Sequence, residues 1–184
     1  IKIYHDADLF QTSTGFSVAE DRRSWLTAGT SIHLWLDDIS SQPSVEAVVA
    51  RELTHRLLGQ RGIETAWILE GVSAFEADGL RVLGSHWASA RRHDLVRDAM
   101  GSREILRWEE LDSFDHLSGE DLALARAQSW SLVASIVSDY GLEGLRQFLA
   151  QAAVNDDLAF SLRAAFGVDL DVFLAAWRGE GLTF

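Results

Sequence analysis

The five residues Arg51-Glu52-Leu53-Thr54-His55 carry the groups in this sequence that are best placed to do chemistry. On a helix, side chains four residues apart leave the same face, so residues 51 and 55 would point to one site. Two His at this spacing can bind one zinc ion, and a Glu after the first His can polarise a metal-bound water. Here Glu52 and His55 stand in the places of that general base and second ligand, but Arg51 stands where the first ligand belongs.

Arg51 changes the chemistry that this stretch can support. Its guanidinium stays protonated and offers no lone pair to a metal. A catalytic zinc needs about three protein ligands and a water, whereas His55 and a later Glu70 supply only two. Zinc lowers the pKa of its bound water to about 7, and Glu52 alone cannot supply that activation. We therefore expect no metal here, with Arg51 pairing with Glu70, Glu52 or both in its place.

The segments that must position these residues differ in their apolar periodicity. Alternating residues predict strands over residues 1–5 and 31–36, with turns between them. After Pro43 the period becomes helical, and this predicts that a helix carries the motif and ends near Gly59 or Gly62.

The rest of the chain predicts a run of helices. We expect one α+β domain over residues 1–184, in which residues 1–80 form a small mixed sheet with the motif helices and residues 81–184 form a helical lobe. The predicted helices cover about 65–78, 85–100 and 120–139, with a break at Tyr140-Gly141, and three more over 142–153, 158–167 and 170–179; residues 105–114 form a short connector.

The sequence around these residues resembles the peptidase MA-like gluzincins, a family of HExxH zinc metallopeptidases. In that family the motif helix is followed by a segment in which a Glu is the third metal ligand, and here that Glu would be Glu70. The likeness continues through 105–114, 125–141 and 165–180, so it covers nearly the whole chain. The residues that carry it in the Glu segment are Trp67, Glu70, Gly71, Ala74 and Phe75, with Ser73 before the Ala. The resemblance implies a zincin-like fold, and zinc as the cofactor of active members.

Two departures from the family pattern involve catalytic positions. Arg51 replaces the first ligand, and Arg126 stands where the family's helix usually has a Tyr that is thought to support the transition state. Either Arg126 lies at the site or it is an ordinary solvent-facing residue. The strand at 31–36 borders the cleft in the family, which makes His33 the best substitute ligand, although a half-exposed strand His is the more ordinary interpretation.

Two functions follow from the resemblance. The first is a catalytically degenerate domain, with Glu52 a vestigial base and His55 and Glu70 vestigial ligands. It would act as a binding or structural module, in which the strand at 31–36 could accept an extended peptide or protein segment by strand addition. The alternative is an active zinc hydrolase with an altered ligand set of His55 and Glu70 plus His33 or Glu76. A third interpretation is a purely structural domain of a larger exported protein.

Composition further narrows the classes of protein to which this chain can belong. The chain has 184 residues, a formal net charge of −12, and no Cys. Such an acidic surface repels phosphate backbones, which argues against a nucleic-acid partner. No apolar run approaches the roughly 18 residues of a membrane span, so we expect no membrane insertion. The start at Ile1 suggests a piece of a longer chain, and the resemblance favours an extracytoplasmic location.

Overall fold

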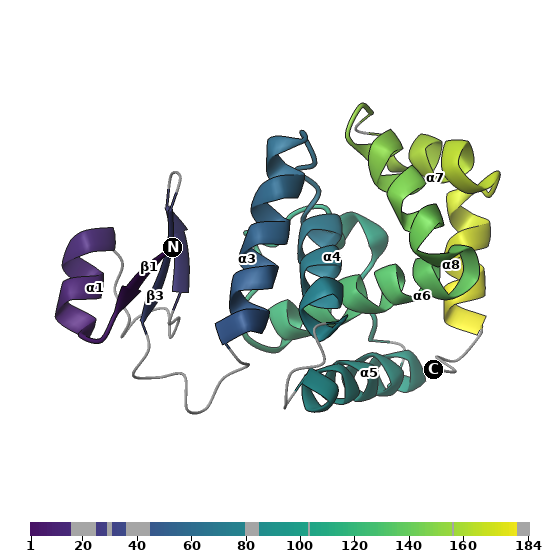
Figure 1. The fold of residues 1–184 in the computed structure, drawn as a ribbon. Helices are drawn as coiled ribbons and strands as arrows, with labels where there is room; N and C mark the ends of the chain where they lie inside the picture. The colour runs from purple at the N-terminus through teal and green to yellow at the C-terminus, as the bar shows by residue number, and fades with distance from the viewer. Residues whose placement is uncertain are drawn as a thin grey trace.

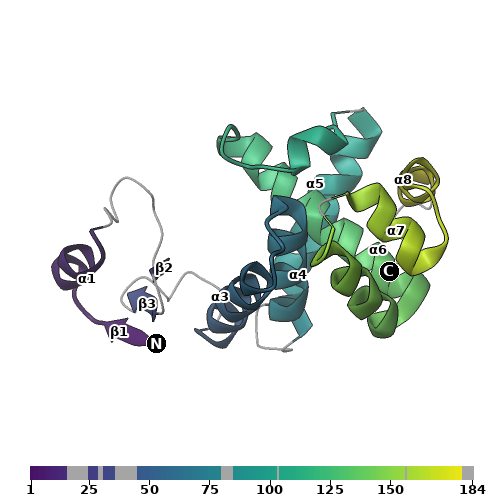
Figure 2. The ribbon, with the colours of Figure 1, turned by 90° about the horizontal axis from the view of Figure 1, so that it is seen from above.

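The protein is mostly helical, with a small sheet near its N-terminus, which makes its class α+β. The computed structural model describes residues 1–15, 25–28, 31–35, 45–79, 85–102, 104–155 and 157–179. Figure 1 shows the sheet and the first helix on one side of α3 and the remaining labelled helices on the other, and Figure 2 shows the same arrangement from above. The elements are β1 (Lys2–Tyr4), α1 (Ala7–Thr14), β2 (Trp25–Ala28), β3 (Ser31–Trp35), α3 (Val45–Gln60), α4 (Ala66–Gly79), α5 (Ser85–Ser102), η2 (Trp108–Leu111), α6 (Gly119–Ala152), α7 (Leu158–Phe166) and α8 (Leu170–Gly179).

The sheet places β3 in its centre. Its strand order is β1-β3-β2, with β1 parallel and β2 antiparallel to β3. Ile32 and Leu34 pack against Val48 of α3, so one face of β3 is covered by the motif helix. Because β3 is paired along both edges, the expectation that this strand accepts an added peptide strand is wrong.

The segment between the two predicted strands holds a helix, α1, where the sequence pattern predicts only turns. The Asp6 side chain caps it by accepting a hydrogen bond from the Leu9 amide at 2.9 Å. Gly15 ends it with a φ of 71°, a left-handed conformation that favours glycine. Phe10 is fully buried and meets Tyr4 edge-on, so α1 covers the sheet face that is turned away from α3.

The helical body is held by one core that joins α4 to α6. Gly71 of α4 lies so close to α6 that an added Cβ would stand 2.4 Å from the carbonyl oxygen of Ser129. Only a residue without a side chain fits this crossing. The crossing brings the α4 residue next to Gly71, which is Glu70, beside the first turns of α6. The largest fully buried side chains of this core are Trp67, Phe148, Ile68, Leu111, Leu132, Ile136 and Leu162.

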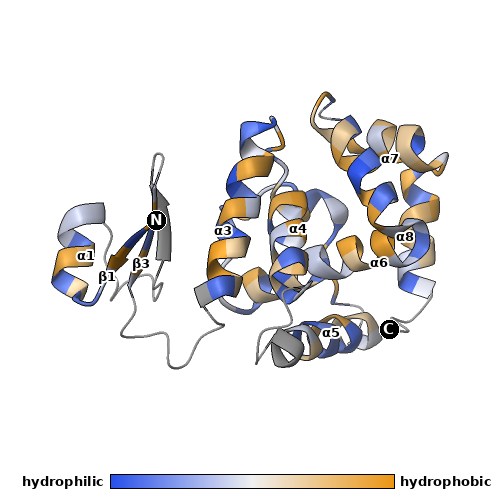
Figure 3. Ribbon diagram, in the orientation of Figure 1, coloured by the Kyte–Doolittle hydropathy of each residue, from blue (hydrophilic) through white to orange (hydrophobic). Residues whose placement is uncertain are grey.

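The long helix α6 changes direction at Gly141. Its φ and ψ of 70° and 178° are not helical, so two helices meet there. The sequence predicts this break at Tyr140-Gly141, and the structure confirms it. Figure 3 shows many hydrophobic residues on α4 and α6 and a largely hydrophilic α5. Within the described ranges, no helix combines the length and the apolar character that a membrane crossing requires.

Candidate functional site

Three helices bring Arg51, Glu70 and Arg126 together. Arg51 of α3 donates from Nη2 to the Oε2 atom of Glu70 on α4. Arg126 of α6 places its Nε 3.6 Å from the same oxygen. The side chains of Arg51, Glu70 and Arg126 are 21%, 16% and 38% exposed, so the cluster is sheltered but reachable from solvent. The predicted pairing of Arg51 with Glu70 is confirmed, and Arg126 belongs to the site.

Glu70 is held in its charged form by its neighbours. Burial is the largest single influence and would raise the pKa of this carboxyl. The attraction of Arg51 and Arg126, the hydrogen bond from Arg51 and the nearby His55 together outweigh it, and the pKa of Glu70 falls below its ordinary value. The site is therefore a carboxylate clamped between two guanidinium groups.

This arrangement does not fit a zinc ion. The oxygen that would bind the metal accepts a hydrogen bond from Arg51, and a second cation stands 3.6 Å from it. Neither guanidinium can act as a ligand. Across the residues whose placement the structure gives, no group of three or more His, Cys, Asp and Glu side chains gathers at one point.

His33 lies apart from the cluster, and the expectation that it is half-exposed is wrong. It is 4% exposed, and its Nδ1 is 2.8 Å from the hydroxyl of Tyr4, with the two rings stacked. Burial lowers the pKa of His33, and the nearby Lys2 and the N-terminal amine lower it further. Because β3 alternates, His33 faces Tyr4 while its neighbours face α3, so the structure does not bring it to Glu70.

The other candidate residues occupy α3 and α4. Glu52 and His55 are half-buried on the motif helix, and His55 is near enough to Glu70 to affect its pKa. Glu76 is exposed.

An apolar cavity of about 580 Å³ lies between α4, α5 and α6, and no sequence motif predicts it. Phe75, His93, Trp130, Ala134 and Val137 are among the residues that line it. The spacing of the three α6 residues puts them on one helical face, and this was the one signal in the sequence that pointed to a shared surface. The walls come from segments distant in the chain, which sequence periodicity alone cannot bring together.

One edge of this cavity is fixed by a charged contact. Arg92 forms an ion pair with Asp78 and lies over the ring of Trp130, 5.4 Å from its centroid. This contact joins α5 to both α4 and α6.

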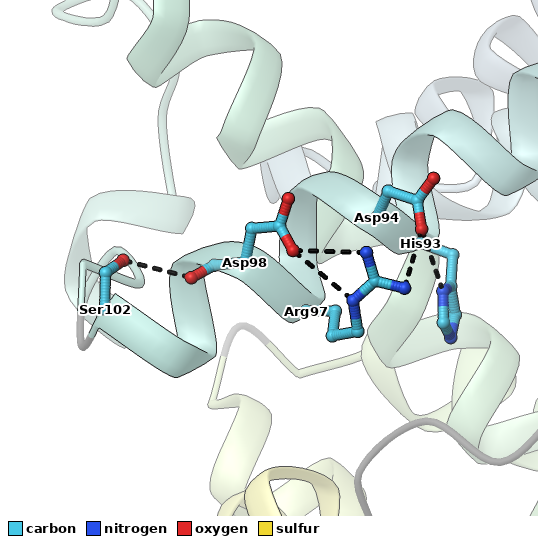
Figure 4. Close-up of polar contacts among 5 residues, drawn as sticks. All are labelled: His93, Asp94, Arg97, Asp98 and Ser102. Atoms are coloured by element: carbon cyan, nitrogen blue, oxygen red, sulfur yellow. Dashed lines mark hydrogen bonds and ion pairs between the residues drawn. The ribbon is translucent and has the colours of Figure 1, made fainter.

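A row of exposed charged side chains lies on the surface of α5 (Figure 4). Arg97 contacts Asp94 at 2.9 Å and Asp98 at 3.2 Å, and all three side chains are more than half exposed. The Ser102 hydroxyl donates to the backbone carbonyl of Asp98 at 3.0 Å. Such solvated pairs contribute little to stability, and we assign them no function.

Comparisons with known proteins do not assign a function to this site. No family model matches the chain, and neither the curated proteins nor the solved structures contain a significant match.

Proposed function

We propose that this chain is a gluzincin-like domain whose metal centre has been replaced by an arginine–carboxylate cluster. It acts as a non-catalytic binding or structural module. The family assignment rests on the sequence resemblance described above, and the loss of catalysis rests on the chemistry of residue 51.

One observation carries the proposal: the Arg51 guanidinium donates to Glu70, the residue that the resemblance identifies as the third metal ligand. A permanent cation at this position satisfies the carboxylate without a metal. Arg126, which stands in place of the family's Tyr, adds a second cation 3.6 Å from the same oxygen. Both departures from the family pattern thus meet at one atom, which supports a coordinated loss of metal chemistry.

Zinc titration of an Arg51→His variant tests the proposal. This change supplies an imidazole one turn before His55 and removes the cation from Glu70. We expect zinc affinity to rise by more than about 100-fold over the unmodified protein, since even supporting residues change metal affinity by about 10- to 100-fold. Calorimetry with protein purified without chelator measures it.

Three controls make the result specific. Arg51→Gln removes the charge without adding a ligand, and Arg56→His adds an imidazole to the same helix at the wrong spacing, so neither should bind zinc. Adding Glu70→Gln to Arg51→His should reverse the gain. Stoichiometric zinc in the untreated natural sequence, with hydrolase activity that Glu52→Gln abolishes, would overturn the proposal in favour of an active hydrolase.

A further inference from the structure

A buried polar pair joins β1 to β3 on the side of the sheet that α1 covers. The hydroxyl of Tyr4 and the Nδ1 atom of His33 are 2.8 Å apart, and the two rings are stacked. Both residues are buried. Phe10 of α1 meets the Tyr4 ring edge-on, with the ring centroids 5.5 Å apart. The ring that Phe10 contacts is therefore the one that bonds to His33.

The helix α1 depends on few contacts for its stability. Of its eight residues only Phe10 is buried. Helices shorter than about 12 residues are marginal in water, so α1 needs its contact with the sheet to remain folded. Segments with few buried apolar contacts open locally at low free energy. A modest change in the sheet beneath Phe10 is therefore enough to release α1.

Protonation of His33 is such a change. The neutral ring can accept the Tyr4 proton at Nδ1. The protonated ring carries hydrogen on both nitrogens, so Nδ1 can no longer accept and the hydroxyl loses this acceptor. Protonation also creates a charge in a buried ring, which is costly unless a carboxylate balances it.

The surroundings of His33 do not balance that charge. The charged groups that act on the ring are Lys2, its partner in the strand register, and the N-terminal amine, and both are cations. On β2, the residue opposite His33 is the apolar Leu26. At the start of α1, the Asp6 side chain caps the helix and Asp8 is exposed. Every contribution to the pKa of His33 therefore lowers it.

We propose that the Tyr4–His33 pair is an acid-sensitive switch: while His33 is neutral α1 packs on the sheet, and protonation of His33 releases α1 and uncovers that face of β3. This inference goes beyond the proposed function and does not depend on it. With α1 released, the pKa of His33 returns toward its ordinary value of about 6.5. The open state then binds more protons than the closed one, so opening becomes easier by up to about tenfold per pH unit below that value.

Hydrogen–deuterium exchange of the α1 amides between about pH 7 and pH 5 tests the switch. Each exchange rate is divided by the intrinsic rate at the same pH, and the peptides are read by mass spectrometry. We expect the protection of residues 7–14 to fall by up to about tenfold per pH unit below about 6.5. The protection of α7, a helix of similar length in the helical body, should not follow this slope.

Two variants assign the slope to His33. His33→Gln keeps a side-chain acceptor for the Tyr4 hydroxyl but cannot be protonated, so the protection of its α1 amides should stay constant over this pH range. His5→Gln is the matched control, because it removes the exposed imidazole next to Tyr4. Its α1 amides should keep the slope of the natural sequence.

An NMR titration of the His33 ring in the natural sequence gives a second measurement, which decides the matter if His33→Gln does not fold. The ring should be neutral at pH 7 with its proton on Nε2, and it should titrate below pH 6.5 together with the α1 amide signals. Equal exchange slopes in the natural sequence and His33→Gln would overturn the inference. So would titration of His33 near 6.5 with the α1 signals unchanged.

Discussion

Arginine meets carboxylate both on the outer face of α5 and between α3, α4 and α6, but different forces hold the two arrangements. On α5, Arg97 contacts acids one and three residues away on the same helix, and its side chain is 59% exposed. At the cluster, Arg51 meets a residue 19 positions away and both side chains are mostly buried. The helix alone produces the first arrangement, whereas only the folded protein produces the second. Charges should therefore affect stability at the cluster and hardly at all on α5.

The largest effect should come from breaking the crossing that holds the cluster together. In Gly71→Ala the new Cβ would stand 2.4 Å from the Ser129 carbonyl oxygen and 2.9 Å from Val133, so α4 must move away from α6. We expect a loss of about 3 kcal/mol in the free energy of unfolding, measured by urea denaturation. Gly59→Ala, with no atom within 4 Å of its added Cβ, is the matched control and should cost nothing. Equal stability of the two variants would contradict the crossing as described.

Neutralising the shared carboxylate should have the next largest effect. Glu70→Gln removes the carboxylate that Arg51 and Arg126 share, and we expect a loss of about 2 kcal/mol in the free energy of unfolding. The matched control is Asp98→Asn on α5, where the side chain is 73% exposed and the loss should stay below about 0.5 kcal/mol. Similar losses in the two variants would erase the distinction between the regions.

Acid should weaken the cluster in a way that depends on Glu70. The pKa of Glu70 is lower in the folded protein than in the unfolded chain, where it is about 4.3. The unfolded chain therefore binds more protons, and stability falls as the pH drops. The contribution is complete above the unfolded value and disappears as the pH falls through the folded one. Unfolding measured from about pH 6 downward should show a steeper loss for the natural sequence than for Glu70→Gln, and parallel curves would contradict this assignment.

The smallest effect should come from the α5 surface. Arg97→Gln removes the centre of the charged row in Figure 4, and we expect a change of less than about 0.5 kcal/mol in the free energy of unfolding. Sodium chloride at about 1 M should erase even this difference, because exposed pairs are screened over a few ångströms at that concentration. A loss comparable with that of Glu70→Gln would show that α5 has a structural role its exposure does not indicate.

Much of the helical architecture could be predicted from the sequence because its signals are local. Apolar periodicity and Gly141 located α4, α5 and the two parts of α6 to within a few residues. The pairing of Arg51 with Glu70 was also predictable, since a guanidinium replacing a metal ligand needs a nearby carboxylate.

The predictions from sequence failed where tertiary contacts determine the local structure. The sequence gives no long apolar period for α1, and its two signals, the cap Asp6 and the closing Gly15, are isolated residues. Because α1 was missed, the second face of β3 had no predicted cover and His33 was expected to be half-exposed. The cavity beside Trp130 needs three helices to be placed together, which no single stretch of sequence specifies.

The central position of β3 has a consequence for recognition. Pairing with a strand edge uses main-chain groups that every peptide possesses, so it discriminates poorly between sequences. In this sheet β1 and β2 are the outer strands, so an added strand would pair with one of them; they span three and four residues. A molecule that binds at the cluster of Arg51, Glu70 and Arg126 would instead contact side chains that project from α3, α4 and α6. Selectivity at this cluster would then depend on the charge and shape of the ligand rather than on its backbone.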